Sequence, residues 1–371
     1  MTKRITVLGT RGIPDVLGGV ETHCQNLYPT IKAHHDVEIC VIARSPYVTY
    51  RHSHYQGVNT RAVWAPKKKS LEAIVHSILA ALASCFDGSN VVHVHAIGPG
   101  LVVPLLRLLG KKVVFTHHGP DYERQKWGGL ARKALMLGER WAVKYANEVI
   151  VISEVINQLI REKYSRIDAH IIPNGVRAPR PIESETIGCI MTKYALPRGK
   201  YVVAVSRFVE EKGLHDLIAA WQQANISWPL VLVGDADHPT EYSEKLKRLA
   251  QNTPGVILTG FISGTTLQAV FSQAGLFAMP SYHEGLPIAL LEAMSYSLPV
   301  VISDIPANAE VALELDAYFP VGNVAALAQK LATRIELPQQ DYQHYLARYN
   351  WETIAEQTMQ VYQQIFNKSM D

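Results

Sequence analysis

Short apolar runs alternate with longer stretches of helical periodicity along most of the chain. In the first half, the runs at residues 5–9, 37–43, 91–95, 112–116 and 148–152 predict strands. Between them, the spacing of apolar positions predicts helices near 20–32, 70–85, 99–109 and 129–146. Strands that alternate with helices in this way favour a parallel, doubly wound α/β sheet.

The same alternation starts again in the second half. Strands are predicted at 201–206, 230–233, 256–259, 276–279 and 300–303. Helices are predicted at 214–224, 241–252 and 264–274, and again after Gly285, where Pro287 suits a first helical position. After residue 323 the chain is predicted to be helical, ending in a long helix at 351–367.

Residues 173–199 separate the two α/β regions. Four prolines punctuate this segment, which has little periodicity. We interpret it as a linker between an N-terminal domain, 1–172, and a C-terminal domain, 200–350. The terminal helix at 351–367 follows a completed second sheet, so we expect it to pack back on the first domain.

Composition is that of a soluble globular protein. The chain has 371 residues, enough for two domains, of which 48% are hydrophobic and 19% charged. No apolar run approaches the roughly 20 residues of a membrane span. The four cysteines are scattered and read as reduced thiols, and Met1 leads directly into a strand without a signal peptide. We therefore expect a cytoplasmic protein.

The net charge of +3 conceals an asymmetry between the halves. Residues 1–172 contain 22 Lys/Arg and 13 Asp/Glu, a net charge of +9, and residues 173–371 contain 14 and 20, a net charge of −6. Halves of opposite sign indicate that the first one meets an anionic partner. The predicted helix at 129–146 mixes basic and apolar residues. It is either a core-facing helix with a solvated basic face or a surface that docks on anionic lipid.

A glycine-rich loop follows the first predicted strand and contains Gly18 and Gly19. A strand, such a loop and a helix present backbone N–H groups to phosphate. The spacing does not match the G-x-G-x-x-G pattern of dinucleotide-binding domains, which argues against a dehydrogenase.

Histidines stand at the ends of two predicted strands. His93 and His95 alternate with valine and therefore point to the same face, with His95 last in its strand. His117 and His118 follow the next strand. Strand-end histidines can be purely structural, but two clusters at the ligand-binding edge of a sheet also suit a functional site.

Two cations flank a turn at the start of the second domain. Arg207 follows a strand, and Lys212 closes the loop that precedes the next helix. Such a pair suits a diphosphate. The alternative is a solvated salt-bridge cluster with Glu210 and Glu211.

Two glutamates flank the helix that follows Pro287. Glu284 precedes this helix, and Glu292 is the sole charged residue on its apolar second turn. Both can face the crevice at the carboxyl end of a strand, where open α/β sheets bind ligands. The alternative makes Glu284 a solvated loop acid and Glu292 a buried structural acceptor. Asp235 and Asp237 match a D-x-D metal motif, which we interpret as a chance match in a loop.

These residues together resemble a family-4 glycosyltransferase with the GT-B architecture, two Rossmann-like doubly wound domains facing across a cleft. The resemblance covers nearly the whole chain and rests on Gly18-Gly19, His95, the pair Arg207 and Lys212, and the spacing of Glu284 and Glu292. Residues 10–14 and 118–127 further resemble a bacterial subgroup that builds surface polysaccharides. This subgroup includes rhamnosyl-, galactosyl- and glucosyltransferases.

The resemblance assigns roles to individual residues. Arg207 and Lys212 would hold the donor diphosphate, Glu284 the donor-sugar hydroxyls and Glu292 the ribose, with His95 near the transferred sugar. Further donor contacts would come from Gly18, Gly19, Gly260, Phe261, Ile262, Gly285, Leu286, Pro287 and Ile288. Candidates on the acceptor side are His117, His118, Asp121 and Arg124. The chain departs from the family at Gly234, where a Gly-x-Gly is common.

The resemblance also implies the reaction. Family members transfer a sugar from a nucleoside-diphosphate sugar with retention of configuration and generally without a metal, so no cofactor or metal is expected. The implied acceptor is a glycan or a polyprenyl-diphosphate-linked sugar, and the first domain is expected to meet an anionic membrane surface and no nucleic acid. A nucleotide-sugar epimerase of similar build and a non-catalytic sugar-nucleotide-binding subunit remain alternatives.

Overall fold

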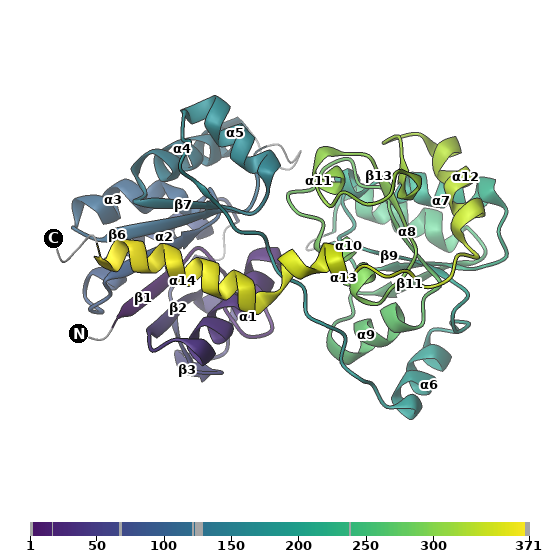
Figure 1. Cartoon of the computed structure of the whole chain (residues 1–371), viewed down its shortest axis with the longest axis horizontal. Coiled ribbons are helices and arrows are strands. Elements are labelled where there is room, and N and C mark those ends of the chain that lie inside the picture. The colour runs from purple at the N-terminus through teal and green to yellow at the C-terminus, as the bar shows by residue number, and fades with distance from the viewer. Residues whose placement is uncertain are drawn as a thin grey trace. The chain divides into compact units, whose positions relative to one another are not determined.

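The computed structural model describes residues 3–16, 18–66, 69–120, 122, 129–236 and 239–367. The chain forms two compact units (Figure 1). The first unit comprises Met1–Gly175 together with Arg348–Asp371, and the second comprises Val176–Ala347.

An eight-stranded sheet forms the centre of the first unit. Its strands lie in the order β3-β4-β2-β1-β5-β6-β7-β8. All neighbours are parallel except β3 and β4 at one edge. The strands are β1 (Arg4–Leu8), β2 (Glu38–Arg44), β3 (His52–Tyr55), β4 (Val58–Val63), β5 (Val91–His95), β6 (Lys112–His117), β7 (Glu148–Val151) and β8 (His170–Ile171).

The helices of this unit include one from the far end of the chain. They are α1 (Gly19–His34), α2 (Lys69–Cys85), α3 (Val103–Leu108), α4 (Gly129–Tyr145), α5 (Glu154–Tyr164) and α14 (Trp351–Asn367), with 3₁₀ turns η1 (Ser45–Tyr47) and η2 (Pro99–Val102). Helices α1 and α14 pack together, and Leu27, Ile354 and Tyr362 share one buried cluster with Val7 and Val91 of the sheet (Figure 1). The terminal helix thus contributes to the core of the first unit.

A six-stranded, wholly parallel sheet forms the centre of the second unit. Its strands lie in the order β11-β10-β9-β12-β13-β14. They are β9 (Val202–Val205), β10 (Leu230–Val233), β11 (Val256–Gly260), β12 (Leu276–Met279), β13 (Val300–Ser303) and β14 (Tyr318–Phe319). The helices are α6 (Ser184–Lys193), α7 (Leu214–Ala224), α8 (Glu241–Gln251), α9 (Gly264–Ser272), α10 (Ile288–Ser295), α11 (Pro306–Ala309), α12 (Val324–Arg334) and α13 (Gln343–Leu346). Three 3₁₀ turns complete the described elements, η4 (Glu210–Lys212), η5 (Leu315–Ala317) and η6 (Ala347–Tyr349).

Each sheet has one topological switch point. In the first unit, β2 lies on one side of β1 and β5 on the other. In the second unit, β10 lies on one side of β9 and β12 on the other. Ligands of open α/β sheets bind beyond the carboxyl ends of the strands at such points. The loops after β1, β5, β9 and β12 are therefore the places to look for a site.

Several elements differ from the sequence-based expectations. Strands β3 and β4 and helix α5 were not predicted, and α6 lies inside the segment that we interpreted as a linker. The predicted helix at 99–109 is a 3₁₀ turn followed by a short α-helix. Helix α10 begins at Ile288, and Pro287 is its N-cap, not its first helical residue. Among the described residues, no helix has the length and apolar character needed to cross a membrane.

Candidate active site

The turn that carries Arg207 and Lys212 connects β9 to α7 in the second unit. Phe208 is buried at 1% exposure and anchors the turn in the core. Gly213 ends it with φ of 61°, and a Cβ there would lie 2.3 Å from the carbonyl oxygen of Pro280. Only glycine allows this approach, which brings the turn against the end of β12. The turn after β9 and the end of β12, two neighbouring strands at the switch point, therefore contact each other at Gly213.

Lys212 and Glu284 form the polar centre of this edge. Nζ of Lys212 lies 2.6 Å from Oε1 of Glu284, and the hydroxyl of Ser281 donates to the same oxygen at 2.7 Å. Arg207 forms an ion pair with Glu211, in which Nη2 lies 4.0 Å from Oε1. Arg207 thus pairs with one of the acids that the alternative interpretation named, whereas Lys212 pairs with Glu284.

Backbone N–H groups at the start of α10 add anion-binding capacity beside this pair. The N–H of Ile288 donates to the carbonyl of Leu286 at 2.9 Å, and Pro287 has no N–H. Among the described residues, the N–H groups of Ala289 and Leu290 have no backbone partner. The first N–H groups of a helix carry the positive end of its dipole. Ala289 and Leu290, which the sequence analysis did not name, are thus better phosphate donors than Ile288.

Glu292 is a partly buried carboxyl group on the second turn of α10. Burial raises its pKa from 4.5 to about 7. Among the described residues, none donates a hydrogen bond to it. A structural acceptor would have such a donor, because burying an unpaired carboxylate is costly. The side chain is thus suited to accept hydrogen bonds from a ligand.

The loops after β10 and β11 contain the other candidate residues of this unit. Phe261 follows β11 and is 52% exposed, next to Gly260 with φ of 69°. Asp235 accepts from Nζ of Lys247 at 2.8 Å and from the N–H of Ala236 at 2.7 Å. Asp235 is therefore paired within the protein, and Asp237 lies outside the described residues.

In the first unit, the glycine-rich loop between β1 and α1 is closed by a buried acid. Oε1 of Glu21 accepts from the N–H of Arg11 at 2.8 Å. Gly18 has φ of 141°, and a Cβ there would lie 2.0 Å from Oε2 of Glu21. At Gly19 a Cβ would meet nothing within 4 Å. Gly18 is therefore needed for the loop to close over Glu21, and Gly19 leaves open space at the start of α1.

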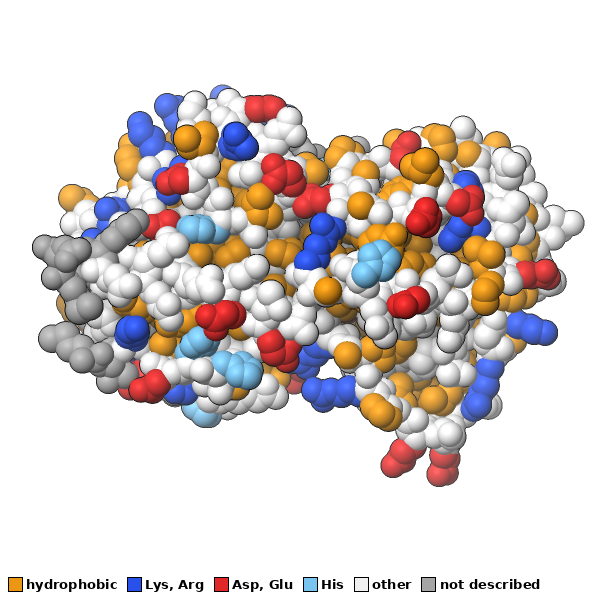
Figure 2. Space-filling model, viewed as in Figure 1, with side chains coloured by type: hydrophobic (Ala, Val, Ile, Leu, Met, Phe, Trp, Pro, Cys, Tyr) orange, Lys and Arg blue, Asp and Glu red, His pale blue; other side chains and the backbone are white. Residues whose placement is uncertain are grey.

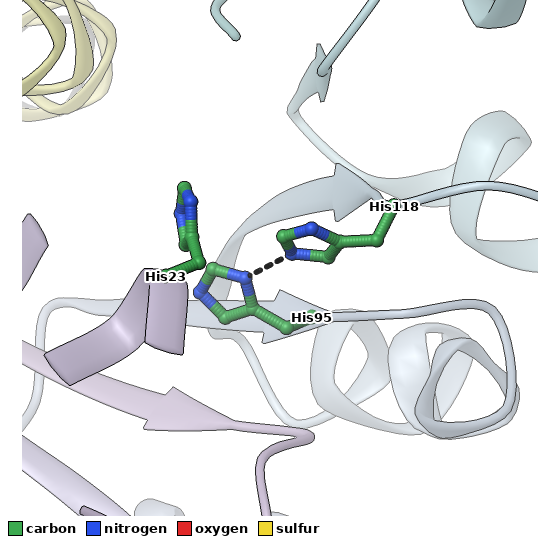
Figure 3. A group of neighbouring side chains, drawn as sticks. All are labelled: His23, His95 and His118. Carbon is green, nitrogen blue, oxygen red and sulfur yellow. Dashed lines mark hydrogen bonds between the residues drawn. The ribbon is translucent and has the colours of Figure 1, made fainter. Parts of the chain in front are cut away.

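His95 ends β5 in a chain of buried hydrogen bonds. Its Nε2 contacts the hydroxyl of Tyr28, which also lies 3.0 Å from Nδ1 of His93. Its Nδ1 lies 2.9 Å from Nε2 of His118 (Figure 3). The rings of His93 and His95 stack with centroids 4.2 Å apart, so the two side chains share a face as predicted. Burial lowers the pKa of His93, His95 and His118 well below 6.5, which leaves all three neutral.

His117 is a support for the loop after β6. The ring is fully buried, with Nε2 at 2.9 Å from Oε1 of Glu139 and Nδ1 accepting from the N–H of Gly119 at 3.0 Å. Both nitrogens are thus used within the protein, and none is left to contact an acceptor. Two other candidates for the acceptor side, Asp121 and Arg124, lie outside the described residues.

Family comparisons identify the class of protein. Residues 17–180 match the family described as Glycosyltransferase Family 4, and residues 190–352 match Glycosyl transferases group 1. The chain therefore belongs to the glycosyltransferases that join a family 4 domain to a group 1 domain. The predicted family and the predicted fold of two parallel-sheet α/β domains are both confirmed.

Individual relatives fall within the same class. The chain is 26% identical to an alpha-maltose-1-phosphate synthase of Mycolicibacterium smegmatis over 98% of this chain and 99% of that protein. It is 26% identical to a putative teichuronic acid biosynthesis glycosyltransferase of Bacillus subtilis over 68% of this chain and 61% of the relative. It is 25% identical to a GDP-mannose:cellobiosyl-diphosphopolyprenol alpha-mannosyltransferase of Xanthomonas oryzae pv. oryzae over 82% and 80%. The protein is thus a glycosyltransferase related to enzymes of polysaccharide biosynthesis.

Solved structures share the fold. A sucrose-phosphate synthase from Thermosynechococcus elongatus aligns with a TM-score of 0.81 at 21% identity, covering 99% of this chain and all of that one. HepE of Anabaena in complex with UDP-glucose aligns with a TM-score of 0.78 at 17% identity, covering 98% of this chain and all of that one. At these identities the likeness defines the GT-B fold alone.

Proposed function

We propose that this protein transfers a sugar from a nucleoside-diphosphate sugar to a glycan or polyprenyl-diphosphate-linked acceptor in bacterial surface polysaccharide synthesis. The observation that carries the proposal is the pair Lys212 and Glu284 beside Arg207 and the start of α10 at the switch point of the second unit. A cation, a carboxylate and helix N–H groups within one sheet edge match a ligand that has both phosphates and hydroxyls.

Different groups at this edge bind different parts of the donor. Arg207, Lys212 and the N–H groups of Ala289 and Leu290 hold the diphosphate. Glu284 accepts hydrogen bonds from the sugar, and Glu292 accepts them from the ribose. The acceptor's hydroxyl oxygen forms the new bond to the anomeric carbon, the bond from that carbon to the diphosphate breaks, and the hydroxyl proton is released. Cations and helix dipoles stabilise the negative charge that develops on the leaving group.

The remaining parts of the proposal rest on the resemblance and on relatives. Retention of configuration and independence of metal are properties of the family. A nucleotide-sugar donor is supported by HepE of Anabaena, which binds UDP-glucose, and by the mannosyltransferase that uses GDP-mannose. The same mannosyltransferase acts on a diphosphopolyprenol-linked sugar, which supports a lipid-linked acceptor.

The surface of α3 and α4 supports docking on an anionic membrane. Leu108 and Leu130 are 85% and 86% exposed, and Met136 and Leu137 are each 38% exposed. Exposed basic residues on α4 alternate with them, namely Arg132, Lys133, Arg140 and Lys144. Figure 2 shows basic and apolar side chains side by side over these helices. Helix α4 packs on the unit through Gly138, Ala142 and Val143, yet it leaves apolar side chains exposed among its basic ones, and this mixture supports docking.

A screen of nucleoside-diphosphate sugars by thermal shift tests the donor part of the proposal. A ligand present at about 100 times its Kd stabilises a protein by about 2.7 kcal/mol, which is readily measured as a rise in Tm. We expect one nucleotide-sugar to raise Tm more than the others. A panel covering the common bases and sugars that leaves Tm unchanged would contradict the proposal.

Transfer itself separates the proposal from its two alternatives. An epimerase converts the donor without any acceptor, and a non-catalytic subunit binds the donor without releasing nucleotide. We expect nucleoside diphosphate to be released when donor and acceptor are both present. A change of the sugar in the absence of acceptor, or binding without release, would favour one of the alternatives.

A further inference from the structure

Three histidines from separate elements of the first unit meet at the edge of its sheet (Figure 3). His23 lies on the first turns of α1, His95 ends β5, and His118 directly follows β6. One ring nitrogen from each lies within 4.8 Å of the others. We propose that His23, His95 and His118 form a site for a divalent transition metal such as Zn²⁺.

His23 lacks a partner for its polar atoms. The side chain is 4% exposed, and neither ring nitrogen has a hydrogen bond. The side chain of Asn174 lies near the ring, but its Oδ1 also lacks a hydrogen-bond partner of acceptable geometry. Buried polar groups are nearly always satisfied, so an unpartnered imidazole indicates a missing ligand. In Figure 3 the ring of His23 stands beside the contact between His95 and His118.

The positions of the other two rings are close to those of metal ligands. Nδ1 of His95 and Nε2 of His118 are 2.9 Å apart. In a tetrahedral site with Zn–N bonds of about 2.0–2.1 Å, ligand nitrogens lie roughly 3.3 Å from one another. The two rings need to separate by a few tenths of an ångström, and the ring of His23 must move inward. His118 is partly exposed, which gives an ion a path of entry.

The surroundings of His95 are compatible with the tautomer that a metal requires. Tyr28 contacts Nε2 of His95 and is itself fully buried beside His93. If Nε2 donates its proton to the hydroxyl oxygen of Tyr28, Nδ1 is left with a lone pair that faces His118. Metal-bound histidines almost always donate their second ring N–H to such a partner.

The donor set also limits which metal fits. All three donors are imidazole nitrogens, which suit zinc, copper, nickel and cobalt, whereas magnesium and calcium prefer oxygen ligands. Three protein ligands leave one tetrahedral position for water or another group. This site belongs to the first unit and the proposed donor site to the second, and the metal is given no catalytic step in sugar transfer.

The functional consequence rests on the proposed transferase activity. His95 is proposed to lie near the transferred sugar, and a bound metal would occupy its Nδ1 and fix its ring. Zinc is therefore expected to inhibit transfer. The metal bound in the first unit is thus a regulator or an inhibitor of sugar transfer, and removal of the metal leaves an active enzyme.

Cobalt binding tests the site without any substrate. Protein freed of metal with a chelator and desalted is titrated with Co²⁺, whose visible absorption is far stronger in tetrahedral than in octahedral coordination. We expect the tetrahedral spectrum to saturate at one equivalent and Zn²⁺ to displace it. The absence of this spectrum in the wild-type protein would overturn the proposal, whatever the variants do.

Variants of the histidines test which side chains bind the metal. His23→Gln and His118→Gln are each expected to weaken binding by more than about tenfold, the scale of effects known for supporting residues of metal sites. The control is the double variant His52→Gln and His54→Gln, which removes an exposed pair from edge strand β3. Circular dichroism and Tm verify folding of each protein. Binding that survives in His118→Gln and disappears in the control would reveal a surface site only and overturn the proposal.

Activity measurements then separate the two proposals. The ratio of transfer rates with and without Zn²⁺ is expected to fall well below one in the wild type and to approach one in His23→Gln. Metal binding without any detectable transfer would count against the proposed function and leave the metal site intact. Active enzyme whose rate ignores zinc at saturating occupancy would overturn the inhibitory role.

Discussion

Nζ of Lys212 lies 2.6 Å from Oε1 of Glu284, although 72 positions separate the two residues in the chain. Their side chains are 15% and 11% exposed, so the pair is formed at a largely desolvated place before any ligand arrives. Gly213 makes the pairing possible, because it lets the turn after β9 reach the end of β12. A cation and a carboxylate are thus held ready for a ligand with phosphates on one side and hydroxyls on the other.

The first prediction concerns the cations at this edge. Lys212→Ala and Arg207→Ala are each expected to lower kcat/KM for transfer by more than tenfold, above about 1.4 kcal/mol of transition-state stabilisation. The reason is that both stabilise charge on the leaving diphosphate. A matched control is Lys330→Ala, which removes a lysine paired with Asp316 in the same unit. If both cation variants transfer sugar at the wild-type rate, the assignment of Arg207 and Lys212 to the diphosphate is wrong.

The second prediction concerns Glu292 as a ribose acceptor. Glu292→Gln keeps the shape of the side chain and removes its charge, so nucleoside diphosphate is expected to bind more weakly to a protein that is still folded. In the wild type, affinity is expected to rise as the pH increases through about 7, where the carboxyl group ionises. The phosphates titrate equally for both proteins, so the difference between them isolates Glu292. Equal affinities at every pH, measured by calorimetry, would exclude the ribose role.

Glu292 is also expected to make the free energy of unfolding depend on pH. The folded protein holds the Glu292 proton up to a pKa of about 7, whereas an exposed glutamate loses it near 4.5. Because the folded state binds the proton more tightly, ionisation of this group lowers the free energy of unfolding as the pH rises from about 4.5 to about 7. Glu292→Gln is expected to remove that decline. Parallel stability curves for the two proteins in denaturant would contradict the assigned pKa.

The third prediction concerns metal in sugar transfer. Two cations and helix N–H groups serve the diphosphate, so enzyme treated with a chelator is expected to retain its full rate. The measurement is the transfer rate before and after chelation, with added Mg²⁺ or Mn²⁺ as the comparison. Loss of activity that either ion restores would count against the account and would make Asp235 and Asp237 candidates for metal ligands.

The fourth prediction concerns docking on anionic lipid. Liposome sedimentation is expected to show binding that requires anionic lipid and weakens as salt rises, because attraction between surface charges is screened. Arg132→Glu with Lys133→Glu on α4 is expected to reduce it. Lys245→Glu on α8 is a charge-reversal control, at a side chain that is 66% exposed. Equal recovery in the supernatant with neutral and anionic vesicles at low salt would exclude docking.

The buried parallel strands could be predicted closely from the sequence. The expected strands at 91–95, 230–233, 276–279 and 300–303 coincide with β5, β10, β12 and β13. Parallel strands are covered on both faces, so they appear as continuous apolar runs that end at polar residues, Gly or Pro. Such runs can be located without knowledge of the tertiary contacts.

The elements that were missed give weaker signals. Strand β3, His52–Tyr55, is exposed and polar, and it is ordered by pairing with β4. Helix α6 contributes few buried side chains, among them Ile190 and Met191. Helix α5 did carry a readable signal, because Ser153 caps it by accepting from the N–H of Ile156.

The residues of the candidate site also fall into those that the sequence predicts and those that it does not. Residues at strand ends, such as Arg207 and His95, can be placed by the rule that ligands bind at carboxyl edges. Contacts that depend on how a helix turns against a sheet cannot, and this is why Tyr28 and His23 were not anticipated. Glu21 and Ser281 were missed for a related reason, since each acts by closing a loop whose path the sequence does not reveal.

Product stoichiometry tests the central claim most directly. Purified protein is incubated with the nucleotide-sugar that raises its Tm most, with and without a polyprenyl-diphosphate-linked acceptor, and both nucleoside diphosphate and glycosylated acceptor are quantified. The account predicts that the two products form in equal amounts, only when acceptor is present, and that Lys212→Ala slows both together. Donor conversion without acceptor, or acceptor-dependent binding with no nucleotide released, would contradict it.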